Sequence, residues 1–176
     1  MSNCQNNADQ IDLSPDCSAC AALCCVVFAF DQSESFGIDK AAGEECPNLD
    51  TQNRCMIFQK RTQLGFAGCV TYNCFGAGQR VTQEVFNGKT WRENDHLKQQ
   101  MGAALSVLRR IHEQLSLLRS SKILPLSKEE RSSVEFLENE LSRKEKWTEA
   151  DLQHFPIEQR EKEILSFLSG LRRHVV

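Results

Sequence analysis

The second half of the chain repeats apolar and polar residues with the spacing of an amphipathic helix. Apolar residues recur every three or four positions, so they fall on one face of a helix with 3.6 residues per turn. This stripe consists of Leu97, Met101, Ala104, Leu105, Leu108, Ile111, Leu115 and Leu118. Pro125 follows it, and proline cannot continue a helix. The pattern predicts one helix of about six turns with a buried face.

Further helices are expected after Pro125. Ser127 and Glu130 have the spacing of a capping box, which marks the start of a helix. Apolar residues at helical spacing then follow in two groups: Val134, Leu137 and Leu141, and later Ile157, Ile164, Leu168 and Leu171. Thr148 is placed to cap a short turn, and Pro156 suits a first helical position. The sequence predicts a bundle of three to four helices.

The first half has short apolar runs instead. CVVFAF at 25–30 is rich in β-branched and aromatic residues and predicts a short strand, with CMIF at 55–58 as a second one. VTY at 70–72 is also expected to be extended. For 81–91 a hairpin turn at Asn87-Gly88 and a helix closed by Gly88 both fit, and we favour the helix.

These patterns define the expected organisation. A flexible tail covers 1–15, a cysteine-rich metal-binding module covers 16–90, and a helical region at 91–176 packs on the module. The fold class is α-rich α+β, in which an irregular, metal-bound cysteine module with short strands precedes the helical bundle.

Cysteine content changes the interpretation of the first half. The chain has 176 residues and nine cysteines, eight of which lie between Cys17 and Cys74. Such a density is typical of a disulfide scaffold or a metal module. The N-terminus lacks the charged and apolar regions of a signal peptide, and no run of about 18 apolar residues is present. We therefore expect a cytoplasmic protein without a membrane span, in which disulfides are rare and metal binding is the better explanation.

The ligand types narrow the choice of metal. The expected ligands are Cys17, Cys20, Cys24, Cys25, Cys46, Cys55, Cys69 and Cys74. All four histidines lie in the helical half, so the set is essentially all thiolate, and soft sulfur selects zinc, cuprous copper or iron–sulfur clusters. If residue 25 begins a strand, Cys24 and Cys25 point to opposite faces and cannot easily reach one ion. Eight thiolates suggest two closed zinc sites held back to back by this pair; a 4Fe–4S or 2Fe–2S cluster is the alternative.

The cysteine pattern also resembles a known family. DCSACAALCC at 16–25, CPNLD at 46–50, RCMIF at 54–58 and the later Cys69 and Cys74 are similar to the cysteine-cluster family of zinc- or iron-chelating proteins. That family has a C-x2-C-x2-C-C core, whereas three residues separate Cys20 from Cys24 here. The block also resembles the N-terminal module of some bacterial pentapeptide-repeat proteins, and flagellin lysine methylases have a loosely similar pattern around an iron–sulfur cluster. The resemblance implies metal chelation and no defined reaction.

Three kinds of function remain open, and the sequence does not decide whether the protein is an enzyme. One of them, a metal buffer or metallochaperone, predicts labile, exposed thiolates, whereas the apolar residues that flank the cysteines suggest buried ones. Of the other two, the first is a non-catalytic metal-binding protein whose helical half contacts a protein partner. The second is a cluster-dependent redox enzyme, for which His96, His112 and Glu113 would be the proton-transfer candidates. We expect His112 instead to be a hydrogen-bonded residue at the edge of the core, and His96 to be solvated. The net charge of −3 argues against nucleic acid as a partner.

Overall fold

The computed structural model describes residues 11–143 and 145–175, and within them the regular structure is helical. The cysteine-rich half contains short helical segments: α1 (Cys24–Val27), η2 (Phe58–Lys60), α2 (Gly68–Thr71), α3 (Ala77–Arg80) and η3 (Val81–Val85). The second half begins with another short segment, η4 (Trp91–Glu93). The second half contains longer ones: α4 (Asp95–Ser121), α5 (Lys128–Leu141), α6 (Glu149–His154), α7 (Ile157–Gly170) and η5 (Leu171–His174).

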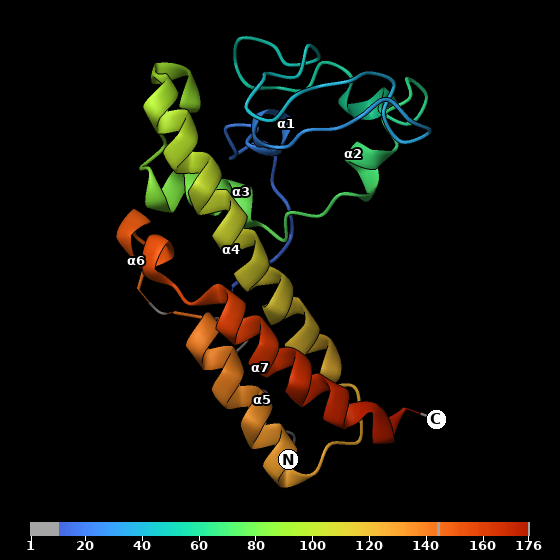
Figure 1. Ribbon diagram of the computed structural model, residues 1–176, viewed down its shortest axis with the longest axis vertical. Coiled ribbons are helices and arrows are strands. Elements are labelled where there is room, and N and C mark those ends of the chain that lie inside the picture. The colour runs from blue at the N-terminus through green and yellow to red at the C-terminus, as the bar shows by residue number, and fades with distance from the viewer. Residues whose placement is uncertain (1–10, 144, 176) are drawn as a thin grey trace, which may run out of the picture.

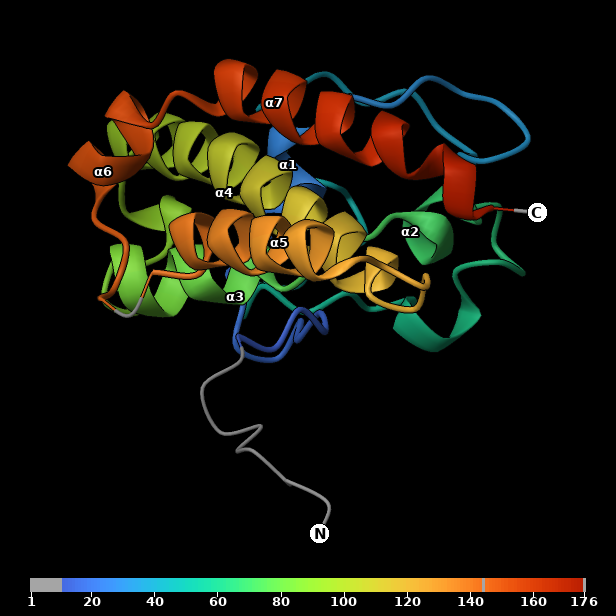
Figure 2. The same cartoon turned by 90° about the horizontal axis from the view of Figure 1, so that it is seen from below.

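Helix α4 is the central element of the molecule. All eight residues of the predicted apolar stripe are buried along it, which confirms the long helix. Figures 1 and 2 show α5 returning beside the C-terminal part of α4 and α7 running alongside both. The helical bundle is therefore confirmed, with α4, α5, α6 and α7 as its members.

Polar contacts define the ends and neighbours of these helices. Ser127 and Glu130 form the predicted capping box of α5, and Thr148 forms one with Asp151 at α6. Pro156 precedes the first residue of α7 instead of occupying it, because its backbone is not yet helical. Ion pairs also join helices, as between Arg110 of α4 and Glu161 of α7, where Nη2 and Oε2 are 2.6 Å apart.

The predicted strands are wrong in the described residues, where the structure has no strand and two isolated bridges, Phe30 with Lys40 and Leu49 with Cys55. The run at 25–30 begins instead as helix α1, and the one at 70–72 overlaps α2. These runs are too short for β-propensity to decide the backbone when the neighbouring loops offer no strand to pair with. The helix favoured for 81–91 is confirmed over Val81–Val85.

The two halves share a core and several hydrogen bonds. Val27 of α1 packs on Gly102 of α4, where an added Cβ would lie 3.4 Å from the valine Cγ2 atom. Trp91 donates from its indole Nε1 to the carbonyl oxygen of Ala21 at 2.7 Å. Of the expected tail, residues 1–10 with Cys4 lie outside the described residues. The carbonyl oxygen of Ile11 accepts a hydrogen bond from Arg119 of α4 at 2.7 Å.

Candidate metal centre

The eight cysteines come from several short segments of the first half. Cys24 and Cys25 begin α1, Cys69 lies in α2, and Cys74 precedes α3. The remaining four, Cys17, Cys20, Cys46 and Cys55, lie on loops. None of the eight is in a disulfide, and their exposure ranges from exposed for Cys17 to buried for Cys46.

The Cys24–Cys25 pair differs from the sequence-based expectation. Because α1 is a helical turn and not a strand, the two side chains do not point to opposite faces, and their Sγ atoms are 3.9 Å apart. Two sulfurs bound to one tetrahedral zinc at about 2.3 Å lie roughly 3.8 Å from each other. The strand on which the opposite-face expectation depended is therefore absent here, and the sulfur separation is compatible with a shared ion.

A second contact places Cys20 beside the segment of Cys74. The Cys20 Sγ atom lies 2.7 Å from the position of a Cβ on Gly78, so a larger residue at Gly78 would displace the sulfur. The Cys74 carbonyl oxygen accepts from the amide of Ala77 at 2.9 Å. Gly76 between them has a φ of +74°, which an L side chain rarely adopts. The glycine-rich segment thus brings Cys74 and the Cys20 loop together.

Electrostatic effects among the thiols identify their neighbours. Burial raises the pKa of Cys20 to about 12, and the thiols of Cys24 and Cys74 act in the same direction. Burial likewise raises the pKa of Cys69 to about 11, with contributions from Cys24, Cys46 and Cys55. Arg61 lowers the pKa of Cys69, but burial outweighs this effect. The thiols therefore form one connected group around Cys24, in which burial favours the protonated form.

The thiols lie near one another, but they are not arranged to coordinate an ion. In residues 11–143 and 145–175, no three His, Cys, Asp or Glu side chains lie close enough together to hold one metal ion. The donor set fits a thiophilic ion chemically, because it consists of soft sulfur from residues near one another. Binding an ion would draw further sulfurs toward the Cys24–Cys25 pair.

His112 links α4 to the cysteine-rich half. It is fully buried, and its Nδ1 and Nε2 atoms lie 2.6 Å from the Phe75 carbonyl oxygen and 3.0 Å from Arg80 Nη1. Burial lowers the pKa of His112 to about 4, so the ring is neutral. Its hydrogen bonding is as expected, although it lies deeper than the core edge, whereas His96 is exposed. His112 thus contacts the backbone of Phe75, the residue that follows Cys74.

Two residues beside the thiols were missed by sequence reasoning. Lys40 is only 5% exposed; burial lowers its pKa, and the thiols of Cys46 and Cys25 act in the opposite direction. The Tyr72 hydroxyl is buried without a hydrogen-bond partner in the described residues. Burial raises its pKa, and Cys24 and Cys74 act in the same direction. A lysine and a tyrosine in polar loops give no sequence signal of burial.

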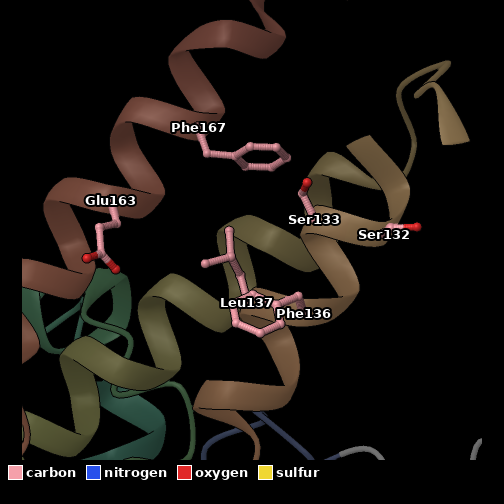
Figure 3. A pocket seen from close by; sticks show the side chains of 6 residues that line it. All are labelled: Ser132, Ser133, Phe136, Leu137, Glu163 and Phe167. Atoms are coloured by element: carbon pink, nitrogen blue, oxygen red, sulfur yellow. The ribbon is translucent and has the colours of Figure 1, made fainter. Parts of the chain in front are cut away.

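The helical half has its own surface feature away from the cysteines. Figure 3 shows a shallow hollow between α5 and α7, with Phe136, Leu137 and Phe167 pointing into the space between the helices. Phe136 is 63% exposed. None of the described helices has the length and apolar character needed to cross a bilayer.

The fold and the site define a helical protein with a group of neighbouring free thiols. The chain is 38% identical over 117 residues to "Uncharacterized protein YybG" of Bacillus subtilis (strain 168). The match covers 66% of this chain and 42% of YybG, so the chain spans less than half of that relative. No model of a known protein family matches the chain, and no solved structure does either. The resemblance to the cysteine-cluster family stays a prediction.

Proposed function

We propose that the protein binds metal ions through its eight clustered cysteines and that these ions are structural. The observation that carries the proposal is the group of thiols around Cys24, with the Sγ atoms of Cys24 and Cys25 3.9 Å apart. In the family that the sequence resembles, a similar cysteine pattern is associated with zinc or iron. The proposal comprises closed, all-thiolate sites and about two zinc ions per chain.

The need for a metal follows from the small core of the first half. Between residues 28 and 65, the buried side chains are Lys40, Cys46 and Leu49. Burial of one leucine contributes about 2 kcal/mol, which is little for such a long segment. A structural zinc ion contributes about 10–16 kcal/mol of apparent binding energy in small domains, and this energy becomes folding energy.

The vicinal cysteines refine the expected arrangement. We propose that Cys24 and Cys25 can ligate the same ion, because their sulfur separation matches the edge of a tetrahedral zinc site. Because the two cysteines lie at the centre of the group, they are also near the cysteines that would bind a second ion. This arrangement replaces two sites separated by opposite faces of a strand.

An iron–sulfur cluster is the second candidate, and the surroundings of Tyr72 favour it. The Tyr72 ring lies 5.4 Å from that of Phe28, and its buried hydroxyl lacks a partner among the described residues. Hydrogen bonds to cluster sulfurs tune the reduction potential, and an aromatic cover limits solvent access. A cluster would make a redox or cluster-dependent enzymatic activity the leading interpretation.

The proposal also covers the cellular compartment and the binding partners. A reducing compartment such as the cytoplasm would keep the thiols available for metal. A protein partner would bind the helical half, where the hollow between α5 and α7 exposes Phe136. Nucleic acid is not part of the proposal because of the negative net charge.

Substitution of single cysteines tests the metal site. Cys20→Ser should lower the bound metal per chain and destabilise the first half, since Cys20 belongs to the group around Cys24. Cys4→Ser is the matched control, because Cys4 lies in the polar N-terminal sequence outside the expected ligand set. Elemental analysis after anaerobic purification should separate the two variants. Equal metal content in both would contradict the assignment.

A further inference from the structure

Lys40 is a buried cation in a segment that otherwise buries little. Its Nζ donates to three backbone carbonyl oxygens, of Val26 at 3.3 Å, Ala41 at 3.0 Å and Glu44 at 2.9 Å. These bonds use all three N–H donors of an ammonium group. Carbonyl dipoles satisfy the donors but do not cancel the charge, and a buried charge normally requires a counter-charge.

The usual counter-charge of lysine is a carboxylate, and in the described part of the chain Lys40 has no ion pair with one. Glu44, the acidic residue beside it, is exposed and accepts from the Ala41 amide through Oε2 at 3.2 Å. Burial lowers the pKa of Lys40, and the thiols of Cys46 and Cys25 oppose this effect more strongly than Glu44 does. The ammonium group therefore lies between the turn that carries Cys25 and the loop that leads to Cys46, bonded to the carbonyl oxygens of Val26 and Glu44.

The backbone around Lys40 joins two of the cysteine-bearing segments. Val26, which accepts from Lys40, directly follows Cys25 in α1, and its carbonyl oxygen also accepts from the amide of Gly43 at 2.9 Å. The amide of Cys46 donates to the carbonyl oxygen of Cys25 at 3.0 Å. Lys40 thus fastens the loop of Cys46 to the end of the turn that carries Cys25.

We propose that Lys40 is a positioning residue and the internal counter-charge of the metal-bound site, holding the loop of Cys46 beside Cys25 and offsetting the negative charge that the site has when its cysteines bind an ion. This inference rests on the proposed metal-binding function. A zinc ion with four thiolates has a net charge of −2, which is costly to bury without a nearby cation. A fixed ammonium offsets part of that charge and disfavours loss of the metal by protonation of the ligands.

The test compares neutral replacements of Lys40 with a matched exposed lysine. Lys40→Met keeps the length of the side chain without charge or donors, and Lys40→Gln keeps N–H donors without the charge. Lys60→Met is the control, because Lys60 is exposed in η2 of the same half. Each protein is loaded with Co²⁺ anaerobically, and the sulfur-to-cobalt absorption reports both affinity and the pH at which half of the metal is released.

Lys40→Met and Lys40→Gln should both lower Co²⁺ affinity by about tenfold or more, as loss of a residue that supports metal ligands does. Both should also raise the pH of half-release by about one unit, because the thiolates lose a nearby positive charge. Lys60→Met should match the wild type. A purely structural role for Lys40 would let Gln restore affinity and would leave the release pH unchanged.

The outcomes separate this inference from the function on which it rests. If the wild-type protein binds no Co²⁺ and holds no metal after purification, the proposed function fails and this inference fails with it. If the wild type binds metal and the two neutral variants match it in affinity and release pH, only the role of Lys40 is overturned. If Lys40→Met does not fold, Lys40→Gln decides the result.

Discussion

The helical half and the cysteine-rich half are stabilised in different ways. Helix α4 buries an unbroken apolar stripe, and the helices around it have capping boxes of their own. The cysteine-rich half has few buried apolar residues between 28 and 65, and its loops depend on hydrogen bonds such as those of Lys40. On the proposed function, the helical half is stabilised mainly by burial of apolar area, whereas metal ions would cross-link the loops of the cysteine-rich half.

Metal removal should give the largest difference between the halves. On the proposed function, a strong chelator removes about 10 kcal/mol or more of stabilisation from the cysteine-rich half, since metal binding is coupled to folding. Hydrogen exchange should then show loss of amide protection at residues 16–75, while the buried turns of α4 stay protected. If both halves lose protection together, the contrast between them is wrong.

A cavity in the helical bundle tests whether the helical half is stabilised independently of metal. Leu108 is 0% exposed in α4, so Leu108→Ala should cost about 2–5 kcal/mol of unfolding free energy. The loss should be similar with and without metal, because the leucine belongs to the helical core. Leu117, 41% exposed on the same helix, is the control, and Leu117→Ala should stay within about 0.5 kcal/mol. Urea unfolding followed by circular dichroism measures both.

Acid should weaken the link between the halves at His112. The folded-state pKa of His112, about 4, lies below the ordinary value of 6.5, so the unfolded chain takes up the proton first. This contribution to stability is complete above pH 6.5 and is lost as the pH falls toward 4, by about 3 kcal/mol in all. Urea unfolding at pH 7 and pH 4.5 should show a smaller pH effect for His112→Gln than for the wild type. His96→Gln, at an exposed site, should keep the wild-type difference.

Loss of one helix cap should have the smallest effect and leave the metal site unchanged. Ser127 accepts a hydrogen bond from the Glu130 amide at 3.2 Å, so Ser127→Ala should cost about 1 kcal/mol. Ser132 is exposed inside α5 and has no capping role, and Ser132→Ala serves as the control. Thermal unfolding measures the difference. A change in bound metal for Ser127→Ala would show that the stability of the helical half and metal binding by the cysteine-rich half are coupled.

The sequence predicts the helical half well because local signals and tertiary burial agree there. The spacing from Leu97 to Leu118 and the pair Ser127 and Glu130 each specify a helix without information from distant residues. In the first half, β-branched residues after Cys25 suggested a strand, and the turn of α1 forms instead. Its carbonyl oxygens accept from Gly43, Cys46 and Lys40, contacts that no local pattern contains.

The candidate site was predictable in composition and not in arrangement. The number and spacing of the cysteines alone identified the eight candidate ligands, and the structure does not test whether they bind metal. The 3.9 Å separation of Cys24 and Cys25 depends on a helical turn that the sequence did not indicate. Burial of Lys40 and of the Tyr72 hydroxyl depends on how distant loops close over them, so their places beside the thiols became visible only in the folded chain.

The most direct test of the central claim is the metal content of the wild-type protein after anaerobic purification, measured by elemental analysis for Zn, Fe and Cu together with the visible spectrum. The account predicts a colourless protein with about two zinc ions per chain. A brown protein with iron and acid-labile sulfide would favour the cluster candidate instead. A folded, metal-free protein whose eight cysteines all react freely with a thiol reagent would contradict the account.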